Sequence, residues 1–227
     1  MTALALSGYL QSTTSKKVYY NTFDTQPDLE ICQSLGITPL YLPLEDSTAE
    51  YIGRKLKSTS IAKWVMKAPF FKALFNIVPS LGNMITLGHI IDRLEKSDDE
   101  IIVLDAPSSG HILTVLESPK NFNQIFQTGA LVKDIHRMLD FMQNPNFVES
   151  WILSIPTELA VTEGFELKEK LEDSGLTNIK TVLNNVLASS NEFSQENLPE
   201  FIDKKLKLRK KFFLKMRENL ELLSQCI

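Results

Sequence analysis

The residues from Asp105 to His111 carry the clearest chemical signal in this chain of 227 residues. They read Asp-Ala-Pro-Ser-Ser-Gly-His, follow the apolar run Ile101–Leu104 and precede a helix-forming stretch, 112–116. A buried strand that ends in Asp and passes through such a loop into a helix is typical of α/β proteins that place a carboxylate on Mg²⁺ beside a nucleotide. Asp105 is therefore a candidate metal ligand. Its alternative role is to cap the helix that follows.

Strand-like and helix-like segments alternate around this motif along the chain. This alternation predicts an α/β fold in which helices flank a parallel sheet. The predicted strands are 18–23, 38–42, 101–105, 148–155 and 179–186, and the predicted helices are 2–14, 28–35, 111–143 with breaks near 118 and 128, 161–171 and 199–223. Ligands of such sheets bind beyond the carboxyl ends of the strands. Asp24, Asp105, Pro156 and Asn184 all stand at predicted strand ends, which favours a site there.

Residues 45–96 form a helical block that we expect to be an insert in a single ATPase-like domain covering 1–227. Its large apolar side chains, with Met66 and Met84 among them, suit an adaptable binding surface. The alternative is that they pack on one another and on the sheet. The predicted helix at 199–223 has one apolar face and a run of basic residues between Lys204 and Lys211. That run suits a solvated face, or, as a second reading, an anionic partner.

Composition excludes several classes of protein. The net charge of −4 gives no general attraction to nucleic acid or to a membrane surface. The two cysteines, Cys32 and Cys226, lie far apart, which argues against a disulfide framework and favours a reducing, cytoplasmic location. No apolar run is long enough to span a bilayer, and the N-terminus lacks the basic region of a signal peptide. His89 and His136 have no partner at metal-binding spacing, so we expect structural roles for both.

The segment from Asp105 to Pro119 resembles switch II of the arsenite-pump and tail-anchored-protein targeting ATPases, which typically reads Asp-Thr-Ala-Pro-Thr-Gly-His-Thr-Leu. Three other segments match the same family in the same order. Residues 18–29 resemble its second strand and switch I, 155–163 its Thr-Pro-Glu-Pro-Leu-Pro-Val-Thr-Glu turn, and 181–186 its Val-Val-Val-Asn-Arg-Val strand. The resemblance covers nearly the whole chain and implies a P-loop NTPase-like fold.

The chain also departs from the family pattern. The loop Gly-Lys-Gly-Gly-Val-Gly-Lys-Thr is not found in it, and residues 1–6 resemble the start of the helix that follows this loop. The domain is therefore expected to lack its first strand, its phosphate loop and its last strand. Switch I reads Asp24-Thr-Gln-Pro27 where the family has Asp-Pro. The cysteines that some members use for zinc or arsenite are missing, which argues against metalloid binding.

The resemblance assigns roles to four residues, each with a simpler alternative. Asp105 would hold Mg²⁺ through water. Asp24 would orient the attacking water, or it caps a turn before Pro27. Gly110 would donate its backbone N–H to the γ-phosphate of ATP, or it is a turn glycine. Asn184 would recognise adenine, or it caps the loop after its strand. The implied cofactors are ATP and Mg²⁺.

The resemblance implies a dimeric Mg²⁺-ATPase that serves a hydrophobic client or a membrane complex, without nucleic acid. Because the phosphate loop supplies most of the grip on phosphates, the chain as given is expected to be inactive or incomplete. The alternative is a non-enzymatic pseudo-ATPase subunit, or a client-binding partner, that pairs with an intact paralogue as a heterodimer. A generic α/β protein that matches by chance is the third reading.

Overall fold

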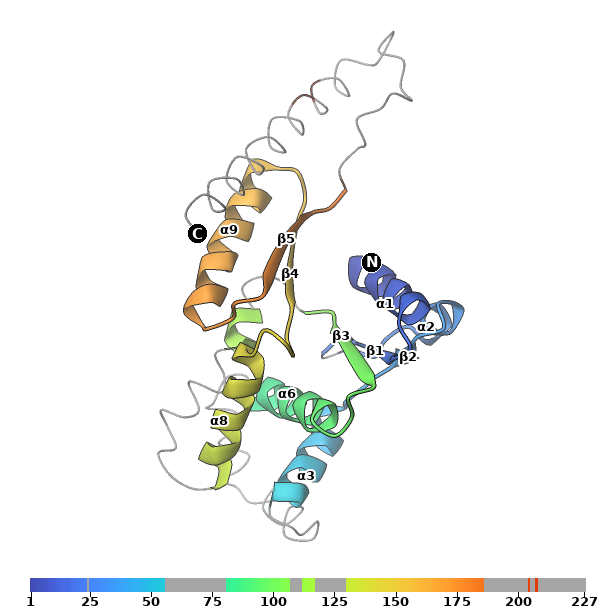
Figure 1. The fold of residues 1–227 in the computed structure, drawn as a ribbon, viewed down its shortest axis with the longest axis vertical. Helices are drawn as coiled ribbons and strands as arrows, with labels where there is room; N and C mark the ends of the chain where they lie inside the picture. Colours follow the sequence, from blue (N-terminus) through green and yellow to red (C-terminus); the bar gives the residue numbers. More distant parts are fainter. Residues whose placement is uncertain are drawn as a thin grey trace. The chain divides into compact units, whose positions relative to one another are not determined.

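The structure is a computed structural model that describes residues 1–23, 25–55, 81–106, 112–116 and 130–185, together with Lys204 and Lys207. The chain divides into two compact units, Met1–Phe141 and Met142–Ile227, which we treat separately. In both units parallel strands are flanked by helices, as the helices and arrows of Figure 1 show. The predicted α/β fold with parallel sheets is therefore confirmed.

The first unit contains a three-stranded sheet in the order β2-β1-β3. The central strand β1 (Lys17–Asn21) pairs in parallel with β2 (Thr38–Pro39) and with β3 (Glu100–Leu104). Four of the five residues of β1 are buried, whereas four of the five in β3 are only partly buried. This difference follows from position, because β1 has a neighbour on each side and β3 stands at the edge of the described sheet.

Helices α1 (Thr2–Thr13) and α2 (Leu29–Ser34) pack with this sheet. Tyr20, Cys32 and Ile37 form a buried cluster, and Ala3 and Leu4 from the first turn of α1 pack against it. Asp28 caps α2 by accepting a hydrogen bond from the amide of Ile31. Gly36, with φ of +65°, ends α2 in the left-handed conformation that glycine adopts at low cost. The two ends of α2 therefore fix the helix so that Cys32 packs against Tyr20 of β1.

Three further helices lie wholly or mostly in the first unit. They are α3 (Leu44–Lys55), α6 (Leu81–Leu94) and α8 (Ala130–Gln143). Gly88 of α6 lies so close to Tyr51 that a Cβ there would stand 2.6 Å from a ring carbon of that tyrosine. The close approach brings α3 and α6 into contact. Residues 112–116 are also helical.

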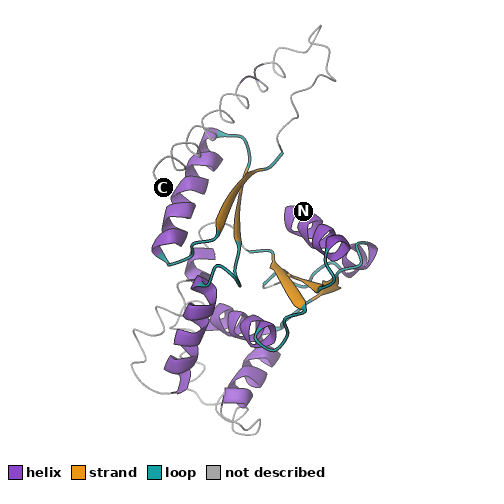
Figure 2. Ribbon diagram, viewed as in Figure 1, coloured by secondary structure: helices purple, strands orange, loops and turns teal. Residues whose placement is uncertain are grey.

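The second unit pairs β4 (Ser150–Ser154) with β5 (Ile179–Leu183) in parallel, and α9 (Glu158–Asp173) packs on them. Figure 2 shows this purple helix running beside the two orange strands. Thr157 caps α9 by accepting from the amide of Ala160. A Cβ on Gly164 would lie 2.4 Å from the hydroxyl of Ser154, so the glycine sets the distance between helix and strand.

The described elements follow the predicted order, but several boundaries differ: β2 ends at Pro39 rather than at residue 42, β4 covers Ser150–Ser154 rather than 148–155, and β5 ends at Leu183 rather than at residue 186. The first strand ends at Asn21 rather than at residue 23, because the side chain of Asn21 accepts the hydrogen bond of the Phe23 amide. Helix α9 begins at Glu158, three residues before the predicted start at Val161, because Thr157 caps it. In the predicted block 45–96 both ends are helical, while 56–80 lies outside the described residues, as does nearly all of 199–223. No helix of the described ranges is long and apolar enough to cross a membrane.

Candidate functional site

Asp105 lies directly after the carboxyl end of β3, where the sequence predicts a metal ligand. Its backbone N–H donates to the carbonyl of Asn21 at 2.8 Å, so the β1–β3 ladder continues to this residue. The hydroxyl of Tyr20 donates to Oδ2 of Asp105 at 2.6 Å. No hydrogen bond from the described residues reaches the other carboxylate oxygen, Oδ1. Within the described residues the carboxylate is therefore held at one oxygen, and Asp105 is partly exposed.

Strand register explains why Tyr20 reaches Asp105. Tyr20 pairs with Val103, and side chains alternate along each strand, so Tyr20, Val103 and Asp105 lie on one face of the sheet. The tyrosine ring is 4% exposed. Burial raises the pKa of Tyr20 far above its ordinary value, and the hydrogen bond to Asp105 raises it further. The hydroxyl therefore keeps its proton at physiological pH and acts as a donor.

The turn after β1 leads to Asp24, which is itself outside the described residues. Asn21 is fully buried, and its amide nitrogen donates to the carbonyl of Leu40 at 2.8 Å. Its side-chain oxygen accepts from the amide of Phe23 at 2.9 Å. Phe23 has φ of +57°, a conformation that is strained for a bulky residue. The chain is therefore forced into a defined turn just before the predicted catalytic residue.

Asn184 follows the carboxyl end of β5 in the second unit. Its backbone N–H donates to the carbonyl of Ser154 at 2.7 Å, which extends the β4–β5 ladder by one step. Its side-chain oxygen accepts from the amide of Asn185, whose φ is +57°. Asn184 is exposed. Gly110 is outside the described residues, so the four predicted site residues are described only in part and in separate units.

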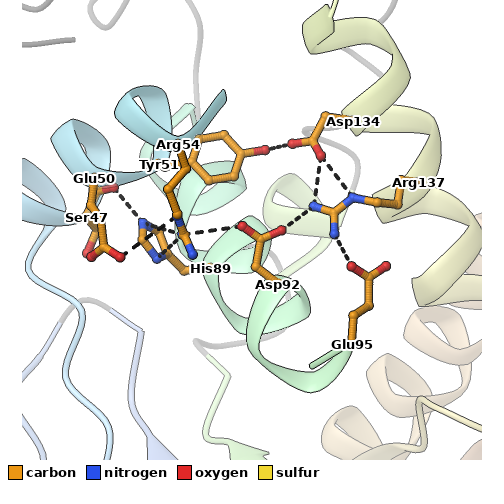
Figure 3. Close-up of polar contacts among 9 residues, drawn as sticks. All are labelled: Ser47, Glu50, Tyr51, Arg54, His89, Asp92, Glu95, Asp134 and Arg137. Atoms are coloured by element: carbon orange, nitrogen blue, oxygen red, sulfur yellow. Dashed lines mark hydrogen bonds and ion pairs between the residues drawn. The ribbon is translucent and has the colours of Figure 1, made fainter. Parts of the chain in front are cut away.

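A polar network joins α3, α6 and α8 (Figure 3). Of its residues, only His89 is marked by the sequence, as a structural histidine. Arg137 of α8 lies at its centre. The guanidinium contacts Asp92 of α6 at 2.6 Å, Asp134 at 2.8 Å and Glu95. The hydroxyl of Tyr51 on α3 donates to Asp134. Arg137 therefore joins α8 to α6 directly, and α3 joins them through the hydrogen bond from Tyr51 to Asp134.

The other half of the network surrounds His89 of α6. Its Nε2 lies 2.6 Å from the carbonyl oxygen of Ser47, so Nε2 carries the proton. Nδ1 then accepts from Arg54 of α3 at 2.7 Å, and Arg54 also contacts Asp92 at 3.3 Å. Burial lowers the pKa of His89, and the neighbouring Arg54 lowers it further, while the carbonyl of Ser47 opposes the shift. The imidazole is neutral at physiological pH, as the hydrogen bonds require.

The network holds more acidic than basic groups. Burial raises the pKa of Asp134 and outweighs the opposing effect of Arg137. Asp92 and Asp134 are 8% and 6% exposed, so each depends on its arginine contacts. No cluster of His, Cys, Asp or Glu among the described residues has the form of a metal site. The arrangement acts as a clamp on the three helices.

The fold and the strand-end carboxylate place the chain in the class of α/β proteins with P-loop NTPase-like architecture. A family model of anion-transporting ATPases matches residues 44–184, which is more than half of the chain. The chain therefore belongs to the anion-transporting ATPase family, as its resemblance in sequence predicts. No match is found among curated proteins.

Proposed function

We propose that this chain forms the metal-binding and base-binding parts of an ATP site, with Asp105 holding Mg²⁺ through water. The observation that carries the proposal is the position of Asp105, directly after β3 and next to a turn forced by Asn21. One oxygen of Asp105 is fixed by Tyr20, and the other is suited to a metal-bound water. The donor chemistry fits a hard cation that also takes phosphate oxygens. Bound there, Mg²⁺ would neutralise the charge of the phosphates.

We assign Asp24 to orienting water, Gly110 to the γ-phosphate and Asn184 to adenine, following the family motifs. A phosphate loop is needed as well, and the 227 residues do not contain one. The edge of β3 has no partner among the described strands, which suits the addition of the family's first strand in a single domain. The cytoplasm is the location that the two separated cysteines favour.

The test is ATP hydrolysis by the purified chain. We expect little or no turnover from residues 1–227 alone, since the groups that grip the phosphates are missing. The DNA directly upstream of the Met1 codon gives the second measurement. An in-frame glycine-rich loop ending in Lys-Thr restores the enzyme, and adding it should produce turnover that Asp105→Asn abolishes. Robust turnover by the 227 residues, lost in Asp105→Asn, contradicts the need for that loop.

The second candidate is a pseudo-ATPase subunit that pairs with an intact paralogue and serves a hydrophobic client or a membrane complex. The observation that favours it is again the sequence, which has the switch II motif without the loop. Nucleotide titration separates the candidates. A defined dimer with a complete homologue, in which this chain binds no nucleotide, supports the subunit. Nucleotide binding by this chain, or a homodimer alone, supports the enzyme.

A further inference from the structure

Tyr20 is the one described residue whose side chain hydrogen-bonds the Asp105 carboxylate, and no motif of the sequence marks it. The two residues are 85 positions apart, so only the pairing of β1 with β3 brings them together. The hydrogen bond is short, at 2.6 Å from hydroxyl to Oδ2. A charged acceptor makes such a bond stronger than one between neutral groups.

The position of the Tyr20 hydroxyl is set by packing rather than by the hydrogen bond alone. The ring belongs to the buried cluster with Cys32 and Ile37, and the first turn of α1 covers it through Ala3 and Leu4. Tyr20 is 4% exposed, so its ring is in contact with packed protein on nearly all sides. A donor held in this way orients its acceptor with little loss of entropy, which is how supporting residues fix a binding group.

The hydrogen bond from Tyr20 to Oδ2 restricts how the Asp105 carboxylate can act as a ligand. With Oδ2 occupied by a donor, Asp105 can offer Oδ1 to a metal-bound water in one orientation. Hydrogen bonds to ligating carboxylates generally fix the orientation of the ligand and tune its affinity for the metal. We propose that Tyr20 is a positioning residue for the Mg²⁺ site, acting through Oδ2 of Asp105. This inference rests on the proposed function of Asp105.

The test measures metal affinity with Mn²⁺ as the probe, on the whole protein together with any segment that its gene encodes ahead of Met1. Free Mn²⁺ is followed by electron paramagnetic resonance in the presence of ADP. Tyr20→Phe removes the hydroxyl and keeps the ring, and we expect it to weaken Mn²⁺ binding by about 10- to 100-fold. Affinity for ADP without metal should not change, because Tyr20 acts on the metal only.

Tyr19→Phe is the matched control. Tyr19 is the neighbouring buried tyrosine of β1, and its ring lies under the guanidinium of Arg93 on the other face of the strand. The loss of its hydroxyl should leave Mn²⁺ affinity within about twofold of the original, well short of the loss that supporting residues cause. In a chain that carries Asp105→Asn, Tyr20→Phe should have no further effect on Mn²⁺ binding. These results support the inference.

Equal Mn²⁺ affinity in Tyr20→Phe and the original protein, or an equal loss in Tyr19→Phe, overturns the inference and leaves the metal site of Asp105 standing. An effect of Tyr20→Phe that persists beside Asp105→Asn also overturns it, since the tyrosine then acts through packing. If the original protein binds no Mn²⁺ with nucleotide, the proposed function fails and the inference fails with it. Should Tyr20→Phe not fold, 4-aminophenylalanine at position 20 keeps a donor in place. Near-original affinity then supports the role, and a loss beyond about tenfold overturns it.

Discussion

Removal of the Arg137 guanidinium tests whether the polar network clamps α3, α6 and α8. Arg137→Met keeps most of the apolar stem and deletes the charge. Glu95 is 38% exposed at its side chain, so its contact contributes little. Asp92 and Asp134 are 10% and 7% exposed at their side chains, and each loses a contact of less than 3 Å. The cost therefore comes from these two buried carboxylates.

Breaking a buried ion pair by removing one partner costs about 3–5 kcal/mol. We expect a value near the lower limit, about 3 kcal/mol, because two other contacts remain. Asp92 keeps Arg54 at 3.3 Å, and Asp134 keeps the hydroxyl of Tyr51. A loss of this size corresponds to a roughly hundredfold increase in the equilibrium constant for opening of α6 and α8. Hydrogen exchange of the amides in α6 and α8 measures it directly.

The stability lost in Arg137→Met should depend on pH in a defined direction. The pKa of Asp134 is raised above its ordinary 3.8 in the folded chain, so its contribution to stability falls as pH rises through that range. Arg137 opposes the rise, and without it the pKa of Asp134 moves further upward. The difference in stability between variant and original is thus largest near neutral pH and shrinks toward about pH 4 as Asp134 takes up a proton.

The control is Lys168→Met, which breaks an i,i+4 pair with Glu172 on the surface of α9. It should cost about 0.5 kcal/mol or less. A cost for Arg137→Met below about 1 kcal/mol, similar to a surface pair, refutes the clamp. A cost that is equal at about pH 4 and at neutral pH refutes the electrostatic origin and leaves packing as the cause.

Three further changes test other parts of the structure. Asn21→Ala removes the bonds to the Leu40 carbonyl and the Phe23 amide, so it should destabilise β1 by about 2 kcal/mol or more, measured by urea unfolding. An unchanged midpoint contradicts this role. Gly164→Ala places a methyl group 2.4 Å from the hydroxyl of Ser154 on β4 and should lower the free energy of unfolding by about 1–3 kcal/mol. Adding Ser154→Gly removes that hydroxyl and should recover part of the lost stability. Because the pKa of His89 is lowered in the folded chain, stability should fall as pH drops below about 6.5. His89→Gln can keep both hydrogen bonds but cannot take up a proton, so it should make the free energy of unfolding less dependent on pH. If the slope of that free energy against pH between about pH 7 and 5 is unaltered, other groups cause the dependence.

The sequence predicts what local signals determine. Alternating segments indicate the α/β fold, and an apolar run ending in Asp105 indicates a carboxylate at a strand end. The end of β1 at Asn21 was not predicted, although a buried Asn in an apolar strand is a usable signal for a side chain that terminates pairing. Asp28 and Gly36 mark the limits of α2 because capping acts between near neighbours.

What the sequence does not reveal depends on tertiary register. Tyr20 meets Asp105 because β1 pairs with β3 at one particular offset, and a shift of one residue would turn the tyrosine to the other face. Arg137 meets Asp92 across 45 positions because the tertiary fold brings side chains of α8 to α6, with Met138 beside Gly88 as a second contact. Charged residues on a helix usually indicate a solvated face, so the burial of Asp92 and Asp134 has no signature in spacing or composition.

Cys32 offers a way to observe motion at the back of the predicted metal site. Its thiol is 0% exposed and shares the cluster with Tyr20, and burial together with Asp28 raises its pKa. Cys226 is the other cysteine of the chain, so after Cys226→Ser a thiol reagent has a single target. That target reacts only when α2 lifts away from β1. The rate of alkylation then measures how often the packing that holds Tyr20 against Asp105 opens. The measurement needs no nucleotide, metal or partner.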